Sequence, residues 1–145
     1  TLTAGSFATL AGSETLTNKT ITFADNTLTG VASLTTAQTL TSKTFTGYTE
    51  TVYALGTSGS QALNPANGTI QTCAAAGTVT FTDSLSAGQS IVLMLTGGST
   101  YTINYPTMTW VSSTGNTAPT LGAANTLVFW KVGSTLYGTN VGKYA

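Results

Sequence analysis

The sequence predicts an all-β protein in two parts. An elongated repeat segment over residues 1–47 precedes a knob over residues 48–145, which is expected to be an antiparallel, jelly-roll-like β-sandwich. Three observations support this prediction. The first part repeats a unit of twelve residues that has no helical period. The repeats are rich in threonine, a β-branched residue that favours extended backbone. The second part alternates apolar and hydroxyl residues between glycine-containing turns.

The repeat segment contains three copies of the unit, TLTNKT, TLTGVA and TLTSKT, which begin at Thr15, Thr27 and Thr39. Repeats this short cannot bury a face within one chain, so their regular apolar positions predict contact with partner chains. The residues predicted to make this contact are Leu16, Ile21, Leu28, Leu40 and Phe45. A flexible threonine-rich linker is the alternative, but a linker needs neither a fixed period nor regular apolar residues.

The knob is expected to consist of short strands. Residues 77–83 (GTVTFTD) place Val79 and Phe81 on one face and threonines on the other, and residues 99–105 (STYTINY) follow the same pattern. Hairpins are predicted at Gly97-Gly98 and near Gly133-Ser134, where glycine permits a tight turn. The remaining candidate strands are 51–55, 69–73 and 108–111.

Two strands of the knob break this alternation. Residues 91–95 and 127–132 are almost continuously apolar, which is typical of strands covered on both faces. A sandwich covers only one face of each sheet. Neighbouring copies of the same chain are the simplest cover for the other face. The sequence therefore predicts a homo-oligomer, expected to be a trimer, with Leu93 and Phe129 at the interface.

The composition argues against several kinds of function. The chain has no histidine and no arginine, so a Ser-His-Asp or Cys-His arrangement is impossible, and its four acidic residues are scattered. We therefore expect no enzyme activity, no metal site and no cofactor. Four basic residues cannot form a nucleic-acid surface, and no apolar run reaches the length of a membrane helix. The lone Cys73 is expected to be a small buried residue.

Aromatic residues of the knob offer one candidate binding site. A neutral glycan can stack on an exposed ring without any charged partner, and Tyr101, Tyr105 and Trp110 are the residues proposed for such contact. The alternative is that these rings pack in the core or in an interface between chains.

The stretch from Ile103 to Gly142 resembles the terminal part of many bacteriophage fibre and virion-associated proteins. In those proteins a tryptophan is followed by a glycine-containing loop, Ala-Pro-x-Leu, an apolar strand, a glycine turn and an aromatic-glycine pair. The corresponding residues here are Trp110, Gly115, Ala118–Leu121, Leu127–Trp130, Gly133 and Tyr137-Gly138. TLTNKT units are also common in phage structural proteins.

The resemblance implies a trimeric, β-structured virion component, and it does not say whether this part sits on the tail, on a baseplate or on the capsid surface. We expect a tail or head fibre protein on the exterior of the virion, in contact with other virion proteins. Contact with host-surface glycan is a further expectation that rests only on the aromatic and amide side chains. A capsid decoration (cement) protein is one alternative, and a bacterial surface adhesin or carbohydrate-binding module is another. Because the chain begins at Thr1 rather than Met, it is expected to be a processed product or part of a longer polypeptide.

Overall fold

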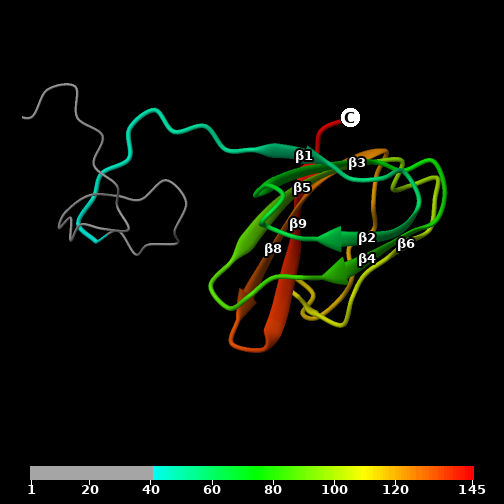
Figure 1. Cartoon of the computed structure of the whole chain (residues 1–145). Helices are drawn as coiled ribbons and strands as arrows, with labels where there is room; N and C mark the ends of the chain where they lie inside the picture. Colours follow the sequence, from blue (N-terminus) through cyan, green and yellow to red (C-terminus); the bar gives the residue numbers. More distant parts are fainter. Residues whose placement is uncertain (1–40) are drawn as a thin grey trace, which may run out of the picture. The chain divides into compact units, whose positions relative to one another are not determined.

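The computed structural model describes residues 41–145, and all strands in that range belong to the unit Phe45–Ala145. No helix occurs in the described range, and the strands form two sheets (Figure 1). The prediction of an all-β protein is confirmed. The six-stranded sheet has the order β1-β3-β5-β8-β9-β7, and the three-stranded sheet has the order β2-β4-β6. The strands are β1 (Val52–Ala54), β2 (Gly59–Leu63), β3 (Ile70–Ala74), β4 (Val79–Asp83), β5 (Ser90–Thr96), β6 (Ile103–Asn104), β7 (Thr109–Trp110), β8 (Ala124–Val132) and β9 (Thr135–Lys143).

From β1 to β6 the chain alternates between the two sheets. Each strand from β3 to β6 pairs in parallel with the strand two places before it. In the large sheet Ile70 pairs with Val52 and with Val92, and in the small sheet Val79 pairs with Gly59. This part of the chain is therefore a short parallel solenoid. The sheets are mixed, and the prediction of an antiparallel sandwich is wrong for these strands, because apolar alternation is the same in parallel and antiparallel sheets.

The C-terminal part adds antiparallel pairing to the large sheet. Strand β8 pairs antiparallel with both β5 and β9, and the β8–β9 hairpin turns at Gly133-Ser134 as predicted. The hairpin predicted at Gly97-Gly98 is wrong. Strand β5 ends there, but the chain crosses to the small sheet, where β6 pairs in parallel with β4. The glycines allow the chain to turn, but they do not determine which strand the residues after the turn will pair with.

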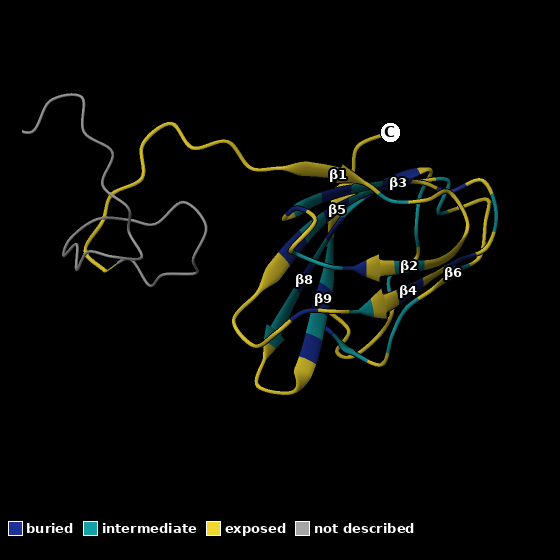
Figure 2. Ribbon diagram, viewed as in Figure 1, coloured by how far each residue is buried: buried dark blue, intermediate teal, exposed yellow. Residues whose placement is uncertain are grey.

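The hydrophobic core is built from residues of both sheets, and buried residues occur along their strands (Figure 2). Strand β4 follows its predicted pattern, with Val79 and Phe81 buried and Thr80 and Thr82 exposed. The largest contributions to the core come from Leu63, Phe81, Ile91, Leu93, Leu95, Leu127 and Phe129. Burial of this apolar surface is the main term that stabilises the two-layer arrangement.

The residues of the repeat segment that were predicted to contact partner chains fall mostly outside the described range. Leu16, Ile21, Leu28 and Leu40 precede residue 41, and their predicted roles stay predictions. Phe45 is described, and its side chain is 63% exposed.

Candidate interaction surface

The side of the six-stranded sheet that faces away from the core, here called the outer face, carries every second residue of its strands. Strand β5 illustrates the alternation, since Leu93 is buried in the core while its neighbours Val92 and Met94 are half-buried. Paired residues form rows across the sheet. The first row crosses five strands and contains Val52, Ile70, Val92, Val128 and Thr139.

Two further rows carry other large side chains of the outer face, and a row of small residues, Ala74, Thr96 and Ala124, lies beside them. The second contains Thr72, Met94 and Thr126, and the hydroxyl of Thr126 donates a hydrogen bond to the Met94 sulfur at 3.3 Å. In the third row the rings of Trp130 and Tyr137 stack, with centroids 5.8 Å apart and planes 14° apart. The outer face is therefore a surface of aliphatic, aromatic and hydroxyl groups, with no charged side chain in any of these rows.

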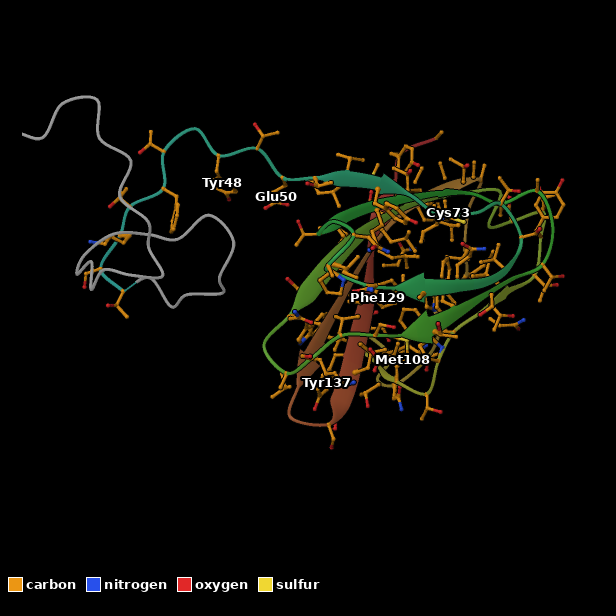
Figure 3. The ribbon with its side chains drawn as sticks, in the orientation of Figure 1. Tyr48, Glu50, Cys73, Met108, Phe129 and Tyr137 are labelled. Atoms are coloured by element: carbon orange, nitrogen blue, oxygen red, sulfur yellow. The ribbon has the colours of Figure 1, made fainter. Side chains whose placement is uncertain are left out.

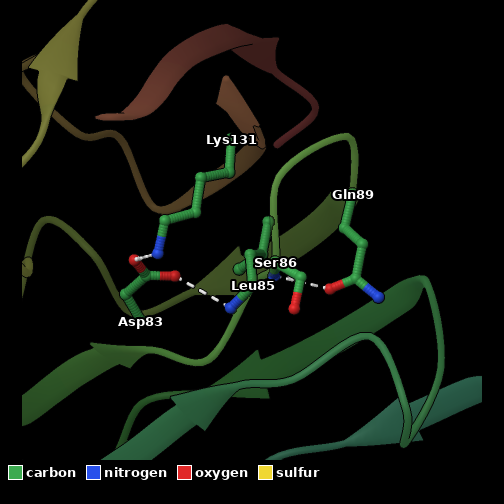
Figure 4. Close-up of polar contacts among 5 residues, drawn as sticks. All are labelled: Asp83, Leu85, Ser86, Gln89 and Lys131. Carbon is green, nitrogen blue, oxygen red and sulfur yellow. Dashed lines mark hydrogen bonds and ion pairs between the residues drawn. The ribbon is translucent and has the colours of Figure 1, made fainter. Parts of the chain in front are cut away.

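The lysine of strand β8 turns to the opposite side. Lys131 forms an ion pair with Asp83 at 2.6 Å, and both side chains are about four-fifths buried (Figure 4). Asp83 also accepts a hydrogen bond from the backbone nitrogen of Leu85 at 2.9 Å, a side-chain contact that stabilises the turn after β4. Because Asp83 belongs to β4 and Lys131 to β8, the pair links the two sheets and leaves the outer face uncharged.

Leu93 and Phe129, predicted as interface residues, lie instead in the core of the chain. Neither side chain has exposed surface, and Phe129 lies between the sheets (Figure 3). Both are covered within the chain and are not available to a partner. Residues 91–95 and 127–132 carry apolar side chains on both sides of their strands, and the residues on the side that the chain itself does not cover are Val92, Val128 and Trp130. The predicted cover of this second side by other copies stays a prediction.

The three aromatic residues proposed for glycan contact do not form an exposed site. Tyr105 and Trp110 pack edge to face in the core, with ring centroids 4.8 Å apart, and Trp110 is only 8% exposed. Tyr101 is 39% exposed and lies in the turn after β5, where its backbone nitrogen donates to the Gly97 carbonyl. For Tyr105 and Trp110 the core-packing alternative is therefore correct, since both rings are covered by other apolar groups.

Tyr105 provides a test of this core placement. Its hydroxyl is buried with no hydrogen-bond partner in the described part of the chain, and burial raises the pKa of this hydroxyl above its ordinary value of 10.0. We expect Tyr105→Phe to be neutral or to raise the free energy of unfolding by about 1 kcal/mol at neutral pH, because it removes an unsatisfied polar group.

The same substitution should change the response to alkaline pH. The folded chain holds the Tyr105 proton more tightly than the unfolded chain, so stability falls as pH rises above the unfolded pKa, by about 1.4 kcal/mol per pH unit from this group. Tyr105→Phe should remove this contribution. Urea unfolding of both proteins at neutral pH and above pH 10 measures the difference. A clear loss of stability in Tyr105→Phe at neutral pH would contradict the expectation.

Two surface hollows lie next to turns of the chain, and each is lined by one residue of the outer face, Ser90 in the first and Thr139 in the second. One, of about 590 Å³, lies between the turns at residues 64–69 and 84–90, and the other, of about 270 Å³, lies between residues 110–119 and β9. Neither is lined by a charged side chain. Within residues 41–145 there is also no group of three or more metal-ligating side chains. Both hollows therefore offer only neutral polar and apolar groups to a ligand.

Cys73 matches its prediction as a small buried residue. It is 2% exposed, its sulfur donates a weak hydrogen bond to the Gly56 carbonyl at 3.4 Å, and burial raises the pKa of its thiol. A raised pKa keeps the thiol protonated and unreactive.

In the part of the chain that the structure describes, no helix is long and apolar enough to cross a membrane.

Comparison with known proteins finds no matching family, no matching curated sequence and no matching solved structure.

Proposed function

We propose that the protein is a structural component of a bacteriophage virion, a homotrimeric tail or head fibre protein on the outside of the particle. In this proposal residues 1–47 form a shaft or attachment segment in which chains bury one another's apolar positions. The part from Tyr48 onward is the knob, and it lies within the compact unit Phe45–Ala145. The protein acts by assembly and carries out no reaction.

The observation that carries this proposal is the twelve-residue repeat. Rungs of the solenoid vary in length, since Val52 pairs with Ile70, 18 residues later, and Ile70 pairs with Val92, 22 residues later. The repeats instead keep a constant twelve residues, which favours treating them as a separate element. Because they cannot bury their leucines alone, they need partner chains.

Features of the described unit also support a structural role. Its surface is rich in hydroxyl and amide groups and has few charges, as suits a rigid part that must persist outside cells. Exposed apolar side chains gather in the stretch that leads into the solenoid, where Phe45, Tyr48 and Val52 are each more than 60% exposed. Large apolar groups exposed together are typical of interaction sites. The same features suit a capsid decoration protein, which the following experiment separates from a fibre.

The location of the protein in particles tests the proposal. We expect a labelled chain to appear on the outside of purified virions by electron microscopy, on tails or as projections from the head if it is a fibre. Replacing Leu16, Leu28 and Leu40 together with Asp in the full chain should reduce incorporation into particles by about tenfold or more, because the charges would be buried between chains.

A matched control replaces Thr15, Thr27 and Thr39 with Ser, which keeps the hydroxyls and the period. This control should be incorporated at the parent level. Label spread evenly over the capsid would favour the decoration alternative. Label present only in infected cells and never on particles would refute the proposed function.

A further inference from the structure

The two outward surfaces of this fold differ sharply in chemistry. On the small sheet, paired residues Ser60, Thr80 and Asn104 form an exposed polar row, and Asn104 donates a hydrogen bond to the Thr80 hydroxyl at 3.2 Å. The corresponding row on the large sheet is aliphatic, with Ile70, Val92 and Val128 side by side. A sheet face in contact with water normally carries polar residues. The small sheet meets this expectation, whereas the outer face of the large sheet does not.

The absence of charged side chains on the outer face limits the kinds of partner that could bind there. No row of this face carries a charged side chain, and Lys131, the one lysine within β8, is turned inward to Asp83. A charged partner, such as nucleic acid or an acidic peptide, would lose water from its charges and gain no pairing here. A second copy of this chain brings the same neutral face. Contact between copies would bury apolar surface on both sides without desolvating any charge.

We propose that the outer face of the six-stranded sheet, centred on Val92, Val128 and the stacked pair Trp130 and Tyr137, is the surface through which copies of this chain associate. This inference rests on the proposed function, since it names the surface that a multimeric virion component would use in its knob. It also explains why β5 and β8 are apolar on both sides. Their inner residues fill the core of one chain, and their outer residues meet another chain.

A single charge at the centre of the outer face should separate the copies. Val128 is half-buried between Val92 and Thr139 in the first row, so a lysine there can extend to solvent in a free chain but is enclosed when copies meet. In the full-length chain we expect Val128→Lys to raise the dissociation constant by about 100-fold or more. Light scattering after size-exclusion chromatography measures the mass. Circular dichroism checks that the strands are retained.

Thr82→Lys is the matched control, because Thr82 is exposed on the outward side of the small sheet. It introduces the same charge into a β-strand and should keep the parent mass.

A second measurement, of tryptophan fluorescence, uses the parent protein alone. Trp130 lies on the outer face and Trp110 in the core, so quenching of tryptophan fluorescence by acrylamide should increase when the parent protein is diluted enough to dissociate.

The outcomes separate this inference from the proposed function. A parent that is monomeric at micromolar concentration would overturn the inference. So would a folded Val128→Lys protein that keeps the parent mass, or quenching that does not change when the copies separate. If the labelled chain is on virions while Val128→Lys keeps the parent mass, the virion role stands and this face is not the contact. If the purified parent is monomeric but Trp130 is shielded in particles, another virion protein covers the face, and self-association through it is wrong.

Discussion

We expect Phe129→Ala to lower the free energy of unfolding by about 3 to 5 kcal/mol. The Phe129 side chain has no exposed surface, and its ring lies within 6.2 Å of the Tyr105 ring and 6.3 Å of the Trp110 ring, measured between centroids. On β9 it faces Gly138, whose missing side chain leaves the space that the ring fills. Alanine would remove the ring and leave a cavity that the neighbouring strands cannot close.

Equilibrium unfolding in urea, at one fixed protein concentration, measures this loss. Val132→Ala is the control, because Val132 lies on the same strand but is 61% exposed, and we expect it to change stability by no more than about 0.5 kcal/mol. Equal unfolding midpoints for Phe129→Ala and the parent would show that Phe129 is not at the centre of the core.

Local patterns in the sequence predicted individual strands well. Strand β4 was predicted from alternating Val79 and Phe81, and the β8–β9 hairpin from the glycine at position 133. Both features depend on residues close together in the chain, where side-chain alternation and turn chemistry act directly. Strand β2 was missed, because its sequence GSQAL has only two apolar residues and no alternation that includes a large one.

The pairing of strands could not be predicted from the same patterns. Strand β5 pairs with β3 and β8, neither of which is its immediate neighbour in the chain. Pairing partners are chosen by contacts between distant residues, and an alternating strand is compatible with either direction. The parallel solenoid therefore had no local signature, whereas the glycines at 97 and 98 wrongly favoured a hairpin between neighbouring strands.

The sequence predicted that the knob has an apolar surface for contact with other copies, but it did not identify the residues that form this surface. In a run such as LVFWKV at residues 127–132, both faces are apolar, so the sequence does not tell which one meets the core. Lys131 adds to the ambiguity, because it is on the core-facing side and is accommodated there by Asp83. The aromatic residues posed the same problem. Burial of Tyr105 and Trp110 depends on their packing with Phe129, a contact between residues far apart in the chain.

We expect Gly97→Ala to lower the free energy of unfolding by about 2 to 5 kcal/mol. Two costs combine at this position. Gly97 has a φ angle of +78°, a left-handed conformation that disfavours any side chain. A β-carbon there would also lie 2.6 Å from the backbone oxygen of Ala75, too close for either atom to remain in place.

The position is further fixed by hydrogen bonds that prevent the turn from moving away. The Gly97 nitrogen donates to the Ala123 carbonyl at 2.7 Å, and its own carbonyl accepts from the backbone nitrogens of Thr100 and Tyr101. A shift that relieved the contact with Ala75 would break bonds at the point where the chain leaves β5 for the small sheet. The strain must therefore remain in the folded protein or be relieved by losing these bonds.

Gly133→Ala separates the two costs. Gly133 has a φ angle of +58°, but a β-carbon there would have no atom within 4 Å, so only the left-handed conformation is penalised. We expect this variant to lose about 1 to 2 kcal/mol. Thermal and urea unfolding of both variants should place Gly97→Ala clearly below Gly133→Ala. Equal losses would mean that the close approach of Gly97 to Ala75 contributes nothing, and that the crossing from β5 to the small sheet can adapt to a side chain.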